Sequence, residues 1–210
     1  MSDYKKIKVD IIDLKVHNIH NIYNACKYAG YQTNIFNSDQ NKINSDILIL
    51  PGVGSFKSGM NYIKKKNLNN KIQDFLDNNN SKLLLGICLG MQLLFSKSEE
   101  FGNCKGLNLI NGEIKMLRKS NNLKIPHIGW NKIISNNYSF SNYFKNKSFY
   151  FIHSYCAYPK NKKEVFGETN YGKYNFCSIV KKKNIIGTQF HPEKSSEDGI
   201  NFLKKLTKFL

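Results

Sequence analysis

The most informative stretch of this 210-residue sequence is Leu84-Leu85-Gly86-Ile87-Cys88-Leu89-Gly90-Met91-Gln92. The apolar run at residues 82–87 predicts a buried β-strand, and the spacing of apolar residues from 89 to about 95 predicts a helix. Few residues are left to join the two elements, so the turn at Cys88 must be tight. A buried strand that leads directly into a helix is typical of a parallel sheet covered by helices.

The sequence before this stretch shows the same alternation of strand and helix. Gly30 has the position of a helix stop, and Pro51 with Gly52 ends an apolar strand. Strands that are apolar on both faces indicate a parallel sheet buried between two layers of helices. The patterns predict strands at residues 8–14, 33–37 and 46–50, and helices at 21–28, 55–65 and 70–78.

The sequence after Gly106 contains more strand-like segments, at residues 113–117, 148–156, 176–180 and 185–189. We expect these strands to add antiparallel pairs at the edge of the same sheet. A last helix is predicted at 198–210, with an apolar stripe of Ile200, Leu203, Leu206 and Leu210. No repeat or linker divides the chain, so residues 1–210 are expected to form a single α/β domain. Its fold would be an open, mostly parallel sheet flanked by helices with antiparallel edge strands.

The composition argues against several classes of protein. The formal net charge is +17, but Arg118 is the only arginine, and planar guanidinium groups are the usual readers of phosphates and bases. We therefore expect no nucleic-acid partner. No apolar run is long enough to cross a membrane and the N-terminus is charged, so we expect no membrane association and a cytoplasmic location. The five cysteines form no C-x-x-C pair, and His17 with His20 is a weak zinc pattern, so no metal is expected.

Cys88 has the context of a nucleophile elbow, in which a strained turn between strand and helix presents the reactive side chain. Gly86 and Gly90 flank it with the pattern G-x-C-x-G, and side chains at these positions would collide with the turn. The N-terminus of the following helix favours a thiolate, and its free N–H groups can stabilise an oxyanion. A thiol nucleophile also needs a base that a third group orients. His191 and Glu193, directly after the predicted strand at 185–189, supply a base and an orienting carboxylate.

The segment Gly86-Ile87-Cys88-Leu89-Gly90-Met91-Gln92, together with Gln189-Phe190-His191-Pro192-Glu193-Lys194-Ser195, resembles the class I (triad) glutamine amidotransferases. Three further segments narrow the resemblance to one subgroup, the glutaminase subunits of imidazole glycerol phosphate synthases. These segments are PGVGSF at residues 51–56, KIPHIGWN at 124–131 and FYFIHSY at 149–155. The likeness spans nearly the whole chain, and P-H-I-G-W-N is its most discriminating part.

The resemblance implies a reaction and a set of roles. Cys88 would attack the side-chain amide of glutamine, His191 would transfer protons, Glu193 would orient His191, and a glutamyl thioester would be hydrolysed without any cofactor. The partner would be a (β/α)8-barrel cyclase in a heterodimer, which receives ammonia through a channel and makes imidazole glycerol phosphate and AICAR in histidine biosynthesis. The remaining roles are glutamine binding by Gln92, Ser154 and Tyr155, and an oxyanion hole from N–H groups of Val53 or Gly54 and of Leu89.

One loop departs from the subgroup, whose first strand usually ends in D-Y-G-x-G-N. Here Leu14 replaces the tyrosine, and Lys15 and His17 replace the two glycines, so the chain must accept strain or follow another path. The departure leaves open a related glutaminase that supplies ammonia to a sugar-amidating synthase of surface polysaccharides. Two other classes also remain: a γ-glutamyl hydrolase that needs no partner, and a basic binding protein with an inactive site.

Overall fold

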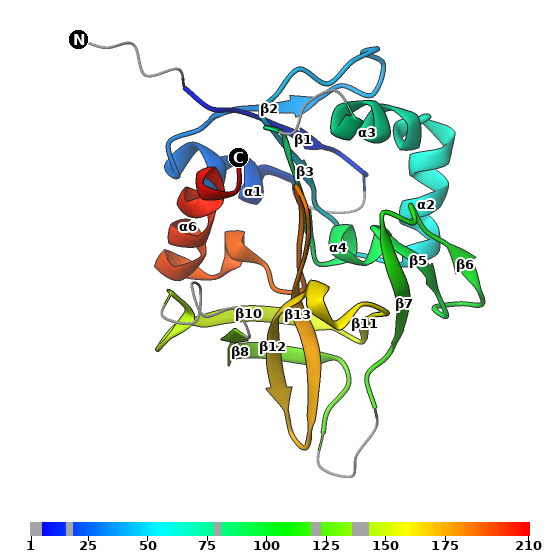
Figure 1. The fold of residues 1–210 in the computed structure, drawn as a ribbon, viewed down its shortest axis with the longest axis vertical. Helices are drawn as coiled ribbons and strands as arrows, with labels where there is room; N and C mark the ends of the chain where they lie inside the picture. Colours follow the sequence, from blue (N-terminus) through cyan, green and yellow to red (C-terminus); the bar gives the residue numbers. More distant parts are fainter. Residues whose placement is uncertain (1–5, 16–18, 78–80, 119–122, 136–142) are drawn as a thin grey trace.

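The apolar strands lie side by side at the centre of a mixed sheet (Figure 1). The computed structural model describes residues 6–15, 19–77, 81–118, 123–135 and 143–210. Over these residues, the path of the main sheet runs β2 (Gln32–Phe36), β1 (Lys8–Ile12), β3 (Ile47–Leu50), β4 (Leu83–Ile87), β14 (Ile185–Thr188), β13 (Tyr174–Lys182), β11 (Tyr155–Pro159), β7 (Ile110–Met116), β5 (Phe95–Ser98) and β6 (Cys104–Lys105). Off this path, β12 (Val165–Tyr171) pairs with β13, and β9 (Ile134–Ser135) pairs with β12.

The strand directions confirm the predicted fold class. β2, β1, β3, β4 and β14 are parallel to one another, whereas β13 pairs antiparallel with β14, and β11 and β12 pair antiparallel with β13. The antiparallel strands therefore extend one side of a parallel sheet, as the sequence after Gly106 predicts.

Helices cover both faces of the parallel part of the sheet (Figure 1). One face packs against α1 (Ile19–Tyr28) and α6 (Ser196–Lys204), and the other packs against α2 (Phe56–Lys65), α3 (Leu68–Asp77) and α4 (Leu89–Leu93). β3 shows why: its residues alternate between the two cores, and all of them are buried. An uninterrupted apolar run is what a strand needs when both of its faces are covered.

Three predicted elements are wrong in extent. The strand predicted at 148–156 is two strands, β10 (Ser148–His153) and β11, separated by a bend at Ser154. The helix predicted from 89 to about 95 ends at Leu93, because Phe95 already pairs with Ile110 of β7. The last helix begins earlier than predicted, and a 3-10 helix (Lys205–Phe209) follows α6.

A small second sheet was not anticipated. β8 (His127–Lys132) pairs with β10 in antiparallel register, with His127 opposite His153 and Trp130 opposite Tyr150. Strands β5, β6, β9 and β12 were also missed by the sequence patterns. Among the described residues, none of the helices combines the length and the apolar character that crossing a membrane requires.

Candidate active site

Cys88 occupies a strained turn between β4 and α4. Its backbone has φ 52° and ψ −108°, in a region that L-residues rarely adopt. The N–H of Cys88 donates to the carbonyl of Thr188 at 2.7 Å, and the Cys88 carbonyl accepts from the N–H of Gln92 at 3.1 Å. These two bonds fix the turn from the neighbouring strand and from the following helix, so the strain is held in place.

The glycines on either side of Cys88 are required by close packing of the backbone. A Cβ atom at Gly90 would lie 1.6 Å from the carbonyl oxygen of Leu50, and one at Gly86 would lie 2.8 Å from the Gly90 oxygen and the Met91 backbone. No side chain fits at either position without moving β3 or α4. The expectation that both glycines serve the turn is therefore met by the geometry.

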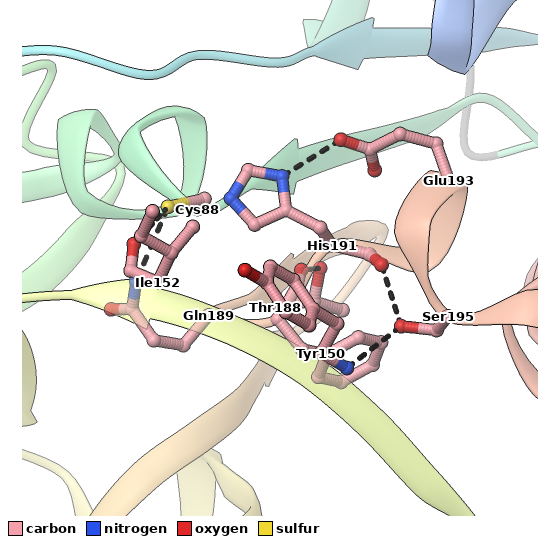
Figure 2. A network of polar contacts seen from close by, with 9 residues as sticks. Cys88, Tyr150, Ile152, Thr188, Gln189, His191, Glu193 and Ser195 are labelled. Atoms are coloured by element: carbon pink, nitrogen blue, oxygen red, sulfur yellow. Dashed lines mark hydrogen bonds and ion pairs between the residues drawn. The ribbon is translucent and has the colours of Figure 1, made fainter. Parts of the chain in front are cut away.

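His191 and Glu193 lie at the same edge of the sheet as Cys88. β14 is the parallel neighbour of β4, and Thr188 is in register with Ile87, so the chain leaves both strands at neighbouring points. Figure 2 shows the imidazole of His191 between the Cys88 sulfur and the Glu193 carboxylate. His191 Nδ1 is 2.7 Å from Glu193 Oε1, and both side chains are almost fully buried. His191 Nε2 faces the sulfur and has no hydrogen-bond partner among the described residues.

The electrostatics of this group favour a charged imidazole. Burial by itself would lower the pKa of His191, but the neighbouring Cys88 sulfur and the Glu193 carboxylate raise that pKa above its ordinary value, to about 10. Two hydrogen bonds fix the backbone of His191. Its N–H donates to the Tyr150 carbonyl at 2.9 Å, and Ser195 Oγ donates to the His191 carbonyl at 2.6 Å. The ring is therefore oriented by both its backbone and its Nδ1 partner.

The residues predicted from the sequence for substrate and oxyanion binding border one cavity of about 550 Å³. A free amino acid fits in a space of this size. The predicted residues on its wall are Val53, Gly54, Cys88, Leu89, Gln92, Ser154 and Tyr155. The described structure also places Glu100, Phe101, Met116, Ile125, Ile152 and His153 on this wall, which the sequence patterns did not indicate.

The N–H of Leu89, which is expected to contribute to the oxyanion hole, is occupied by a backbone hydrogen bond in this structure. The N–H of Leu89 donates to the carbonyl of Gly52 at 3.2 Å, so it is not free to receive an oxyanion in this structure. Gly54, next along the loop, has φ +111°, a backbone state that suits glycine. The Gly52 carbonyl must therefore turn away before Leu89 can act as predicted.

Gln189 is the polar contact of Cys88 that sequence reasoning missed. Its side-chain Nε2 lies 3.6 Å from the Cys88 sulfur, and on another side the sulfur lies 3.8 Å from the carbonyl oxygen of Ile152 (Figure 2). Gln189 precedes His191 by two residues. It lies in the segment from which the sequence analysis assigned roles only to His191 and Glu193. The sequence signal that could have indicated this contact was a glutamine as the last residue of the strand predicted at 185–189.

Comparisons with known proteins identify the family of this chain. The family described as glutamine amidotransferase class-I matches residues 10–207. The chain belongs to this family. It is 39% identical over 206 residues to the imidazole glycerol phosphate synthase subunit HisH of Sulfurimonas denitrificans, covering 96% of this chain and 98% of that protein. It is 43% identical to the subunit of the same name from Bacillus mycoides, covering 93% and 92% of the two chains.

Solved structures of lower identity share the fold of this class-I amidotransferase. One is described as PurLQS from Thermotoga maritima, with a TM-score of 0.71 at 18% identity, covering 97% of this chain and 99% of that one. Another, described as a glutamine amidotransferase, has a TM-score of 0.70 at 14% identity, covering 95% and 98%.

The departure from the subgroup at the first loop is accommodated by strain at Lys15. Lys15 has φ 59°, so it adopts the backbone state that a glycine would take. Its N–H donates to Asp13 Oδ1 at 2.8 Å and its ammonium pairs with Asp13 Oδ2 at 2.6 Å, which stabilises the turn locally. His17, the other substitution and half of the weak zinc pattern, lies outside the described residues.

Four of the five cysteines are buried, Cys88 among them, and Cys104 is half-buried. Burial raises the pKa of Cys156 to about 12 and raises the pKa of Cys26 and of Cys177 further. Cys104 is half-buried on β6. A high thiol pKa leaves little thiolate at neutral pH, so Cys26, Cys156 and Cys177 are poor candidates for a nucleophile.

Two buried histidines support the wall of this amidotransferase's cavity. His127 is enclosed by the rings of Tyr171 and Phe151, at centroid distances of 4.1 and 5.1 Å, and burial lowers its pKa to about 4. Burial also lowers the pKa of His153, to about 3. Both rings are therefore neutral in the folded protein at neutral pH.

These pKa values predict a loss of stability in mild acid. The unfolded chain binds a proton at each histidine below about pH 6.5, whereas folded His127 resists protonation down to about pH 4, so the free energy of unfolding falls as the pH drops through this window. His127 alone would account for about 3 kcal/mol across it. Urea unfolding at about pH 7, 6 and 5 measures the slope. We expect His127→Phe to make this slope shallower; an equal slope in the variant and the parent protein would contradict the assignment.

Proposed function

We propose that this chain is the glutaminase subunit of an imidazole glycerol phosphate synthase, which hydrolyses glutamine and passes ammonia to a cyclase in histidine biosynthesis. The two relatives reported above are named as the HisH subunit of imidazole glycerol phosphate synthase. Each match covers nearly the full length of both chains. The observation that carries the proposal is a cysteine on a strained turn beside an imidazole whose Nδ1 is 2.7 Å from a buried carboxylate. This is the arrangement that activates a nucleophile through an oriented base.

In the proposed reaction, Cys88 attacks the side-chain carbonyl carbon of glutamine. The C–S bond forms, and the resulting tetrahedral oxyanion collapses as the C–N bond breaks. His191 gives its proton to the departing nitrogen, which leaves as ammonia, and then takes a proton from the water that attacks the thioester. The C–S bond breaks as this second tetrahedral intermediate collapses, which releases glutamate and restores the Cys88 thiolate. Glu193 accepts a hydrogen bond from the protonated Nδ1 of His191, so Nε2 is the nitrogen that exchanges protons with the reacting groups.

The cavity beside Cys88 supports glutamine as the substrate. Gln92, Ser154 and Tyr155 border it and offer amide, hydroxyl and backbone groups to the amino acid portion. Glu100, also on the wall, has its pKa raised by burial and accepts a hydrogen bond from the Phe56 N–H at 2.6 Å. A cavity with few polar groups at fixed positions is suited to one small polar ligand.

An apolar surface next to the cavity supports a protein partner. Ile128 and Trp130 on β8 are 56% and 51% exposed, and their cross-strand neighbours Ile152 and Tyr150 lie on the same face. Large exposed apolar side chains grouped on one face mark interaction sites more often than chance. Because Ile152 also borders the cavity, a (β/α)8-barrel cyclase bound here would receive ammonia close to where it forms.

Partner binding is expected to raise the glutaminase rate by about 100- to 1,000-fold, the usual effect of one oxyanion donor. The physical reason is the bond between Leu89 N–H and the Gly52 carbonyl, which must open to free the donor. The experiment measures glutamate release by the purified chain, alone and with the barrel cyclase of the same genome. Bovine serum albumin at equal concentration is the control for nonspecific stabilisation.

Three other outcomes of this experiment would argue against the proposed function. A high rate for the isolated chain that the cyclase does not change would favour a partner-independent γ-glutamyl hydrolase. Activation by a sugar-amidating synthase but not by the cyclase would favour the polysaccharide alternative, which the substitution at Lys15 raised. No glutamate release under any condition would refute the proposal.

A further inference from the structure

A continuous series of buried hydrogen bonds leads from β8 to the Cys88 sulfur. His127 Nδ1 is 3.1 Å from His153 Nε2, and His153 Nδ1 is 2.9 Å from the carbonyl oxygen of Tyr155. The same carbonyl lies 3.0 Å from Gln92 Nε2, which is also 3.1 Å from Gln189 Oε1. Gln189 Nε2 then reaches the sulfur at 3.6 Å. The path joins the small sheet, α4 and the end of β14.

The Tyr155 carbonyl fixes the direction of every bond in the series, because a carbonyl can only accept. His153 must therefore carry its proton on Nδ1, and its neutral ring accepts at Nε2 from His127. Gln92 must present its NH₂ group to this carbonyl, so the atom of Gln189 that meets Gln92 Nε2 must be its oxygen. The NH₂ group of Gln189 is then the one that faces Cys88.

The sulfur consequently has two contacts of opposite polarity. The Ile152 carbonyl, at 3.8 Å, can only accept, so it suits the thiol S–H. The Gln189 N–H can only donate, so it suits the thiolate. A hydrogen bond to the charged form of a group favours that form. Gln189 is fully buried, so water does not compete for its N–H.

We propose that Gln189 is a positioning residue of the glutaminase reaction, which donates an N–H to the Cys88 thiolate and is itself oriented by Gln92 and the Tyr155 carbonyl. This inference rests on the proposed function. Among the described residues, those that line the cavity beside Cys88 do not include Gln189. Its N–H favours the ionised sulfur and holds the sulfur in position beside His191.

The test uses a property of the sulfur that needs neither glutamine nor a partner. In a Cys104→Ser background, which removes the half-buried thiol of β6, the rate of Cys88 alkylation by iodoacetamide is measured against pH. Gln189→Met keeps the volume of the side chain and removes the N–H. Loss of a hydrogen bond to a charged group is worth about 10- to 100-fold. We expect alkylation near neutral pH to slow by at least about 10-fold and the pH midpoint to rise by about one unit.

The same variant should lower the kcat of partner-activated glutaminase by a similar factor. Gln32→Glu, at an exposed position on β2, is the matched control and should leave both measurements unchanged. If circular dichroism shows that Gln189→Met is unfolded, Gln189→Asn keeps a buried amide but draws the N–H back from the sulfur, and the same rise in midpoint is expected. An unchanged midpoint in a folded variant overturns the proposal. Absence of glutaminase activity in the parent protein would refute the proposed function alone, since alkylation still reports on Gln189.

Discussion

Replacing Cys88 with alanine is expected to lower glutamine-dependent synthesis by the complex at least about 10,000-fold while synthesis from ammonium continues. The reason is that an alanine at this position keeps the backbone of the turn but has no atom that can form the thioester. Cys26, Cys156 and Cys177 cannot replace Cys88, because they are buried and burial raises the pKa of each thiol. The measurement is product formation by the complex of chain and cyclase, with either glutamine or ammonium chloride as the nitrogen source.

The ammonium reaction makes the Cys88 result interpretable. Alanine has the same difficulty as cysteine at φ 52°, so the substitution adds no strain to the turn. Cys104→Ser, at the half-buried cysteine of β6, is the matched control and should retain both activities. If Cys88→Ala abolishes the ammonium reaction as well, the residue has a structural role in the complex and its assignment as nucleophile is wrong.

The parallel half of the fold could be predicted because its strands are apolar on both faces. β3 is an uninterrupted aliphatic run that ends at Pro51. β4 is aliphatic except for Gly86 and leads directly into Cys88. Burial between two layers of helices leaves little freedom in such a sequence. The helix predicted at 55–65 could be placed equally well, because Ser55 caps it by accepting from the Ser58 N–H.

The errors arise where pairing, and not local pattern, decides the structure. Residues 148–156 have one continuous strand-like pattern, yet β10 pairs with β8 and β11 pairs with β7 and β13. The bend at Ser154 contains no glycine or proline, so no local signal marks it. Similarly, Phe95 continues the apolar spacing of α4 but belongs to β5 because Ile110 lies beside it.

The sequence motifs predicted the catalytic residues of the candidate site but not the hydrogen bonds between them and their neighbours. Cys88, His191 and Glu193 stand in segments whose residue types and spacing carry the chemistry. The bond between Gln189 and Cys88 joins residues 101 positions apart and depends on the orientation of two amides, which no pattern in the sequence encodes. The occupation of Leu89 N–H by Gly52 depends on a single peptide plane in the loop, which the residue pattern by itself does not encode.

Replacing His191 with asparagine is expected to lower partner-activated glutamate release by about 10,000-fold or more, as removal of a triad base does in other enzymes. Asparagine can still donate a hydrogen bond to Glu193, but it cannot carry a proton from the thiol to the leaving nitrogen. The positive charge that faces Cys88 is also lost, so alkylation of the sulfur at neutral pH should slow together with turnover. Steady-state glutamate release and iodoacetamide alkylation measure the two effects separately.

The Glu193→Gln variant separates the two roles of the imidazole. Its amide can accept from His191 Nδ1 through its oxygen, which lies 2.7 Å away in the native carboxylate, but it provides no negative charge to sustain the imidazolium. We expect turnover to fall less than in His191→Asn, and the pH at which activity is lost on the acid side to shift. Ser196→Ala, beyond the Glu193 loop at the start of α6, is the control and should leave turnover near its native value. Near-normal glutamate release from His191→Asn would mean that another group moves the protons, and the chemistry assigned to this edge of the sheet would have to be abandoned.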